Sequence, residues 1–124
     1  MGHEQIAKKL PALVKRVKQE GRKVVWCSDP MHGNTITSTT GYKTRPFQNI
    51  LAEVRDFFKV HAAEGTVAGG VHFELTGKDV TECLGGDQKI TDEHLAEGLY
   101  ETLCDPRLNA TQALELAFQL SSPT

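Results

Sequence analysis

Residues 29–35 read Asp-Pro-Met-His-Gly-Asn-Thr (DPMHGNT), and this stretch decides how the rest of the chain is interpreted. It follows the apolar run Val24–Cys27, which predicts a short buried strand. Pro30 ends that strand because proline has no N–H for the ladder, and Gly33 permits a tight turn. In parallel α/β folds, active sites collect at the C-terminal ends of strands. His32 is therefore a candidate site residue, although a polar turn in which His32 only hydrogen-bonds to the backbone explains the same pattern.

Composition limits the classes of function. The 124 residues suffice for one domain, and 39% hydrophobic and 24% charged residues are typical of a folded globular protein. The formal net charge of −2 argues against a nucleic-acid binder. No apolar run approaches the roughly 18 residues that span a membrane, and no signal peptide opens the chain. Three widely spaced cysteines without a CxxC motif suggest reduced thiols, so we expect a cytoplasmic protein.

Hydrophobic periodicity predicts alternating helices and strands over residues 1–124, taken as a single segment without a linker. The expected helices are Glu4–Glu20 (kinked or restarted at Pro11), Pro46 to just before Gly65, Thr91–Leu103, and one from Asn109 onward; the expected strands are Val24–Cys27 and Val67–Leu75. The predicted buried stripes are Ile50, Leu51, Val54, Phe57 and Phe58 on the second helix, and Leu114, Ala117 and Phe118 on the last. Ile36–Gly41 is expected to be a Thr/Ser-rich loop.

Two strands that are each followed by a helix make βα units, so the expected fold class is α/β with parallel strands. Two parallel strands alone would leave two open edges, which suggests that the chain is part of something larger. In the second strand, His72 and Glu74 alternate with apolar residues. They would face water in an open sheet and point inward in a closed barrel.

Six motifs, all in the same order, resemble the C-terminal portion of class II (plant-type) 3-deoxy-D-arabino-heptulosonate 7-phosphate (DAHP) synthase. They are WCSDPMHGNT (26–35), GYKTRPF (41–47), GGVHFELTG (69–77), VTECLGG (80–86), CDPRLN (104–109) and ALELAF (113–118). The resemblance implies a (β/α)8 TIM-type barrel, of which this chain would supply the last two βα units. The chain would then be incomplete on its own.

The resemblance also implies a metal-dependent transferase of the shikimate pathway. Such an enzyme condenses phosphoenolpyruvate with erythrose 4-phosphate and water, giving DAHP and phosphate. The family holds a divalent metal, Mn²⁺ or Co²⁺, by Cys, His, Glu and Asp. By motif, His32, Glu74 and Asp105 are the metal ligands. No counterpart of the Cys ligand is found, because the three cysteines of this chain occupy other motifs.

The loop Tyr42–Pro46 adds candidate substrate residues. Lys43 and Arg45 could hold a sugar phosphate, since Arg presents a bidentate fork and Lys a point charge. A solvated basic loop is the alternative. We assign Lys43 and Arg45 as substrate-binding candidates, and His32 and Lys43 as catalytic candidates.

Two neighbouring residues have open roles. Asp29 either orients His32 or caps the turn. Arg107 pairs either with Asp105 or with Glu82, and the sequence does not decide between them.

Two other functions are compatible with the sequence. One is a non-catalytic truncated relic or interaction module that associates with itself or with a missing barrel half. The other is a self-standing metal enzyme that rebuilds its site by oligomerising. In either case we expect no nucleic-acid or membrane partner.

Overall fold

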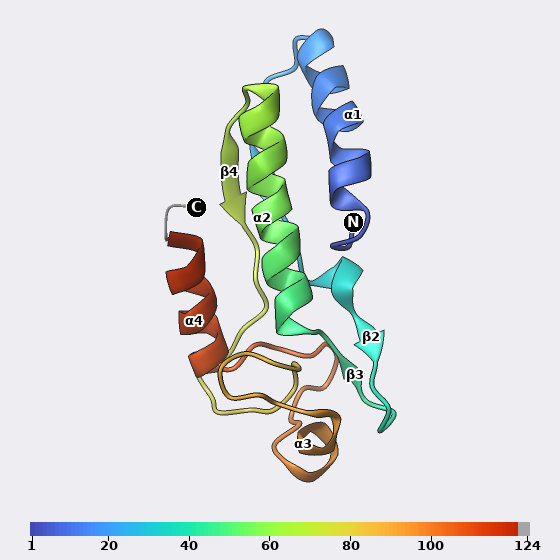
Figure 1. Ribbon diagram of the computed structural model, residues 1–124, viewed down its shortest axis with the longest axis vertical. Helices are drawn as coiled ribbons and strands as arrows, with labels where there is room; N and C mark the ends of the chain where they lie inside the picture. The colour runs from blue at the N-terminus through green and yellow to red at the C-terminus, as the bar shows by residue number, and fades with distance from the viewer. Residues whose placement is uncertain (122–124) are drawn as a thin grey trace.

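The computed structural model describes residues 1–121 as an α/β chain, which confirms the expected fold class. Its elements are α1 (Ile6–Gln19), β1 (Trp26–Ser28), the 3-10 helix η1 (His32–Asn34), β2 (Ile36–Thr37), β3 (Lys43–Thr44), α2 (Phe47–Glu64), β4 (Ala68–Val71), α3 (Asp92–Glu97) and α4 (Ala110–Ser121). Helix α2 is the central element and contacts α1, β4 and α4 (Figure 1). Within these residues, no helix is long and apolar enough to cross a membrane.

Strands β1 and β4 form a parallel pair, and α2 lies between them in the chain. Trp26 lies opposite Ala68 and Ser28 opposite Val71, with an irregularity in the register after Trp26. Gly69 is required at this irregularity, because a Cβ there would lie 2.7 Å from the Trp26 carbonyl oxygen. In residues 1–121, each of these strands has only one neighbouring strand.

Both strands are shorter than the sequence predicts. Val25 and Val67, expected inside strands, are 85% and 77% exposed, because neither has a second strand beside it. β4 stops at Val71, and the chain then lacks regular structure until Leu75 pairs with Leu108 in an isolated parallel bridge. The second predicted strand is therefore two short pairings with different partners.

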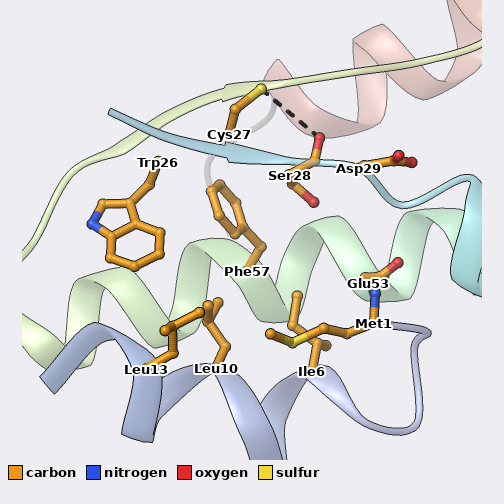
Figure 2. A pocket seen from close by; sticks show the side chains of 10 residues that line it. All are labelled: Met1, Ile6, Leu10, Leu13, Trp26, Cys27, Ser28, Asp29, Glu53 and Phe57. Atoms are coloured by element: carbon orange, nitrogen blue, oxygen red, sulfur yellow. Dashed lines mark hydrogen bonds and ion pairs between the residues drawn. The ribbon is translucent and has the colours of Figure 1, made fainter. Parts of the chain in front are cut away.

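The apolar core has two parts. The first packs α1 on α2 and consists of Ile6, Leu10, Val14, Phe57 and Val60, with Trp26 and Ala68 partly buried against it. The second surrounds the start of α2 and consists of Met31, Phe47, Ile50, Leu51, Cys83, Leu108 and Leu116. A cleft of about 170 Å³ remains between α1, α2 and β1, where Leu10, Trp26 and Phe57 face one another (Figure 2).

Two of the predicted buried stripes are partly wrong. Phe58 is 37% exposed, and Leu114 and Phe118 are 62% and 71% exposed. Helix α4 instead buries Gln112 and Leu116, which lie one turn apart. The Gln112 side chain is satisfied there because it donates to two backbone carbonyls of the loop before α3, at 3.0 and 3.3 Å. The spacing of apolar residues cannot predict a packing face that has a polar residue at its centre.

Helix α3 is shorter than the predicted Thr91–Leu103. It begins after Thr91 as expected, but it ends at Glu97. The hydroxyl of Thr81 donates to the carbonyl of His94 (2.8 Å) and accepts the N–H of Leu99 (2.8 Å). Because the His94 carbonyl and the Leu99 N–H bind the Thr81 hydroxyl, the helix does not continue beyond Glu97.

The remaining boundaries agree with the sequence except in one place. Asn109 and Gln112 exchange the reciprocal hydrogen bonds of a capping box at the start of α4, at 2.8 and 3.1 Å. Helix α1 is one helix with Pro11 inside it. The segment predicted as a loop after η1 forms an antiparallel hairpin of β2 and β3, in which Ile36 pairs with Thr44.

His61 is a buried histidine on α2, with 1% of its surface exposed. Its ring packs against Trp26 and Phe57, with centroid distances of 5.3 and 4.5 Å. Nδ1 lies 2.7 Å from Thr66 Oγ1, whereas Nε2 is buried and has no hydrogen-bond partner among residues 1–121. Burial lowers the pKa of His61, because the charged ring cannot be solvated there.

We predict that the free energy of unfolding falls as the pH drops below about 6.5, the ordinary pKa of histidine. The unfolded chain takes up a proton on His61 in this range, while the folded chain resists protonation down to its lowered pKa. The contribution is at most about 1.4 kcal/mol per pH unit. Urea unfolding between about pH 7.5 and 5.5 should show a steeper loss for the parent chain than for His61→Gln. Equal pH dependence of the two proteins would contradict this.

Candidate metal centre

Asp29 organises the turn that carries His32. Its Oδ1 accepts the N–H of Met31 (3.0 Å) and of His32 (3.3 Å), and its Oδ2 lies 2.7 Å from His32 Nδ1. Partial burial by itself raises the pKa of Asp29, but the hydrogen bonds from the Met31 backbone and from His32 outweigh burial and lower it. Asp29 therefore both caps the turn and orients the ring, so the two alternative roles hold together.

Two buried groups fix the same turn from behind. Asn34 Nδ2 donates to the carbonyl of Pro30 (2.7 Å) and to Glu53 Oε2 (3.1 Å). Glu53 belongs to α2 and is 1% exposed. Gly33 is needed because a Cβ would lie 2.4 Å from the backbone nitrogen of Gly2. This close approach, rather than a left-handed backbone, is what requires glycine here.

The three predicted ligands lie close together, with His32 in η1, Glu74 after β4 and Asp105 in the loop between α3 and α4. His32 Nε2 lies 3.3 Å from Glu74 Oε1 and 3.8 Å from Asp105 Oδ2. One donor atom from each residue lies within 4.8 Å of the other two. The side chain of His32 is 54% exposed and those of Glu74 and Asp105 are 26% and 32% exposed, so the cluster is accessible. The structure therefore brings the three residues together, and their role as metal ligands stays a prediction.

Lys43 and Arg45 lie two residues apart, at and just after β3, and each contacts a different carboxylate. Lys43 Nζ lies 3.0 Å from Asp105 Oδ1, and its hydrogen bond lowers the pKa of Asp105. Arg45 Nη1 forms an ion pair with Glu74 Oε2. Lys43 Nζ and Arg45 Nη1 thus contact the carboxylate oxygens that His32 Nε2 does not face.

Arg45 is fully buried, so the alternative of a solvated basic loop is wrong for this residue. Its Nη1 also donates to the carbonyl of Pro106 (2.8 Å), and its Nε donates to Thr35 Oγ1 (2.9 Å). Nη2 lies 4.0 Å from Asp105 Oδ2 and has no hydrogen-bond partner among residues 1–121. Lys43, in contrast, has a side chain that is 51% exposed.

Arg107 pairs with Glu82, which decides the alternative that the sequence left open. Arg107 Nε and Nη2 lie 3.0 and 2.9 Å from the two carboxylate oxygens of Glu82. Glu82 is fully buried, and no sequence pattern predicts a charged residue inside the fold at this position. It also accepts backbone N–H groups of the loop that carries Asp105.

The arrangement fits a transition metal of mixed nitrogen and oxygen coordination. Metal-ligating histidines usually hydrogen-bond through their other ring nitrogen to a carboxylate, as His32 Nδ1 does to Asp29. One nitrogen and two carboxylate oxygens suit Mn²⁺ or Co²⁺ better than they suit Ca²⁺, which prefers oxygen ligands alone.

No cysteine joins the group in residues 1–121. Cys83 is fully buried in the core, and burial raises the pKa of its thiol to about 12. Cys27 and Cys104 are exposed and free. His72, which shares the predicted strand with Glu74, also lies outside the group and has an exposed side chain.

The fold and this cluster define an α/β protein with a candidate metal site. The chain belongs to the Class-II DAHP synthetase family, whose model matches residues 1–121. It is 57% identical over 118 residues to phospho-2-dehydro-3-deoxyheptonate aldolase AroG of Mycolicibacterium smegmatis (strain ATCC 700084 / mc(2)155), covering 95% of this chain and 25% of that protein. It is 53% identical over 118 residues to phospho-2-dehydro-3-deoxyheptonate aldolase of Streptomyces coelicolor (strain ATCC BAA-471 / A3(2) / M145), covering 95% and 26%.

These comparisons confirm the family resemblance that the six motifs indicate. The chain spans about a quarter of the length of both relatives, 25% and 26%.

We predict that Arg45→Ala costs about 3–5 kcal/mol of folding free energy, because it leaves Glu74 partly buried without its counter-charge. Lys43→Ala removes the same charge from a half-exposed side chain and should cost much less. Urea unfolding of the two variants beside the parent chain measures both effects. Equal losses would mean that Arg45 is not a buried structural cation.

Proposed function

We propose that this chain supplies the His–Glu–Asp part of the metal centre of a DAHP synthase. The reaction joins phosphoenolpyruvate, erythrose 4-phosphate and water to give DAHP and phosphate. The observation that carries the proposal is the convergence of His32 Nε2 with Glu74 and Asp105, in a chain that the family model matches over residues 1–121. The shikimate-pathway role follows from the same family membership.

The metal of this proposal is Mn²⁺ or Co²⁺, held by His32, Glu74 and Asp105. When bound, it would act as a Lewis acid that polarises the aldehyde of erythrose 4-phosphate. Asp29 keeps the ring of His32 oriented through Nδ1, which leaves Nε2 directed at the carboxylates. The fourth ligand, a cysteine, comes from outside these residues, since none of the chain's cysteines joins the cluster in residues 1–121.

The two cations have different parts in the proposal. The ammonium of Lys43 is half-exposed beside Asp105, where it can bind a phosphate or carboxylate oxygen and transfer a proton to a substrate, so Lys43 is the catalytic and substrate-binding candidate together with His32. Arg45 is buried, and its Nη2, which lies 4.0 Å from Asp105 Oδ2 and has no hydrogen-bond partner among residues 1–121, is the part of the guanidinium that remains for a substrate oxygen. Its other contacts hold Glu74 and the Asp105 loop in place.

The fold context of the proposal is a (β/α)8 barrel, to which β1 and β4 contribute two parallel strands. The open edges of both strands, and the exposed Val25 and Val67, are the places where neighbouring strands would add. The partner is the rest of the barrel or a second copy of this chain, and this chain covers only 25% of the length of the first relative. Three free cysteines suit the cytoplasmic location that the sequence suggests.

We predict that His32→Ala, Glu74→Ala and Asp105→Ala each weaken Mn²⁺ binding to this chain by at least about tenfold, because each removes one of three donors. Titration followed by the electron paramagnetic resonance signal of free Mn²⁺ measures the affinity. Asp56→Ala is the matched control, since the side chain of Asp56 is 31% exposed and also pairs with a lysine, Lys59, at 3.6 Å. Unchanged affinity in the three variants, or an equal loss in the control, would remove the cluster from the metal site.

We also predict that this chain alone releases no phosphate from phosphoenolpyruvate and erythrose 4-phosphate at any Mn²⁺ concentration. Three donors and two cations are part of the constellation that stabilises the transition state, and the rest lies outside these residues. Addition of the remaining three quarters of a relative as a separate polypeptide should restore phosphate release, and His32→Ala in this chain should abolish it. Turnover by the chain alone would favour a self-standing enzyme instead.

A further inference from the structure

We propose that buried Glu82 and its partner Arg107 form a positioning unit that fixes Asp105 and thereby sets the metal affinity of the centre. The inference rests on the proposed metal centre and adds two residues that do not belong to the ligand set.

Glu82 accepts five hydrogen bonds, all from the loop that carries Asp105. Its Oε1 accepts from the backbone N–H of Arg107 (2.9 Å) and from Arg107 Nε (3.0 Å). Its Oε2 accepts from the N–H of Glu101 (3.0 Å), the N–H of Thr102 (2.9 Å) and Arg107 Nη2 (2.9 Å). A carboxylate saturated in this way, and fully buried, holds its partners in one geometry.

Asp105 lies between the two parts of the loop that Glu82 holds. Residues 101 and 102 are bound on one side of it and residue 107 on the other, and Thr102 Oγ1 donates to the Asp105 carbonyl (2.7 Å). Leu103 is fully exposed and Cys104 is exposed, whereas Pro106 is buried and its carbonyl accepts from Arg45 Nη1 (2.8 Å). Glu82 therefore holds the loop on both sides of Asp105, in addition to the contact of Arg45 with Pro106.

The backbone of Glu82 is in turn tied to the strand that carries the two cations. Thr44 Oγ1 donates to the Glu82 carbonyl (2.8 Å), and the N–H of Leu84 donates to the Arg45 carbonyl (3.1 Å). Glu82 thus connects the segment of Lys43 and Arg45 with the loop of Asp105. This connection fixes the distance between the Asp105 carboxylate and Lys43 Nζ, which is 3.0 Å.

The pair remains charged at neutral pH. Burial raises the pKa of Glu82, but the hydrogen bonds from Arg107 and from the Glu101 backbone outweigh burial and lower it. Glu82→Gln keeps the shape of the side chain but replaces one acceptor oxygen by an NH₂ group, which cannot accept from the N–H groups around it. Arg107→Lys keeps the charge but loses the fork that contacts both oxygens.

The test measures Mn²⁺ affinity of the full chain by titration. Glu82→Gln should weaken binding by about 10–100-fold, the usual effect of removing a group that orients a metal ligand. Arg107→Lys should give a smaller loss and covers the case in which Glu82→Gln does not fold. The control is Glu101→Gln, in the same loop, whose side chain is 43% exposed and whose partner is Lys78. Unchanged affinity in both Glu82→Gln and Arg107→Lys, or an equal loss in the control, overturns the proposal.

A second background separates positioning from a general loss of stability. If Glu82 acts through Asp105, Glu82→Gln should cause no further loss of Mn²⁺ affinity in a chain that already carries Asp105→Asn. An additive loss in the double variant means that Glu82 acts on the fold as a whole and overturns the proposal.

A third readout needs no metal and distinguishes failure of this inference from failure of the proposed function. In nuclear magnetic resonance spectra, Glu82→Gln should remove the contact between the Lys43 side chain and the Asp105 β protons and speed amide exchange at Thr102 and Arg107. If the parent chain binds no Mn²⁺, the metal centre fails for the chain alone, and this readout still decides the positioning role. A retained Lys43–Asp105 contact in Glu82→Gln overturns it.

Discussion

One buried guanidinium connects the three segments that carry the candidate ligands. Arg45 donates to Thr35 beside the His32 turn, to Glu74, and to the carbonyl of Pro106 beside Asp105. These segments are distant in the sequence, and a single fully buried side chain contacts all of them. Taking a cation out of water costs several kcal/mol unless acceptors surround it. A loop that moved away would remove one of the three acceptors of the guanidinium, so the cost of burying Arg45 penalises displaced arrangements of the centre.

Two buried carboxylates stabilise the irregular segments of the site in a similar way. Irregular segments have backbone N–H groups with no partner in a helix or sheet, and buried ones need an acceptor. Glu82 supplies acceptors to the Asp105 loop, and Glu53 accepts from Asn34 at the back of the His32 turn. Both are less than 2% exposed. The residues of the candidate centre are thus held by two buried carboxylates. Glu82 binds the Asp105 loop, and Glu53 binds the His32 turn.

Much of this arrangement could be predicted from the sequence, and the exceptions have a common cause. His32, Glu74 and Asp105 could be predicted because family motifs place each one after a strand or in a polar turn. The burial of Glu82 and Arg45 could not, because their partners lie 25 and 29 residues away and no local pattern encodes those contacts. The prediction of the buried face of α4 was partly wrong for the same reason, because Gln112, a polar side chain that binds a distant loop, lies at the centre of that face. Local signals, such as the helix caps at Thr91 and Asn109, were predicted correctly, whereas polar contacts between residues far apart in the sequence were not predicted.

The charges of the centre explain why it suits a cation. Three carboxylates, those of Asp29, Glu74 and Asp105, face two cations, Lys43 and Arg45, so the cluster is negative when its histidine is neutral. Lys43 Nζ contacts Asp105 Oδ1 and Arg45 Nη1 contacts Glu74 Oε2, the outer oxygens that do not face His32, while Arg45 Nη2 lies 4.0 Å from the inner oxygen Oδ2 of Asp105. The inner oxygens of Glu74 and Asp105 face the same imidazole nitrogen, at 3.3 and 3.8 Å. One oxygen of Glu74 and one of Asp105 lie within 4.8 Å of each other, and like charges at such a separation repel in a partly buried site. A divalent cation among the three donor atoms would remove this repulsion directly.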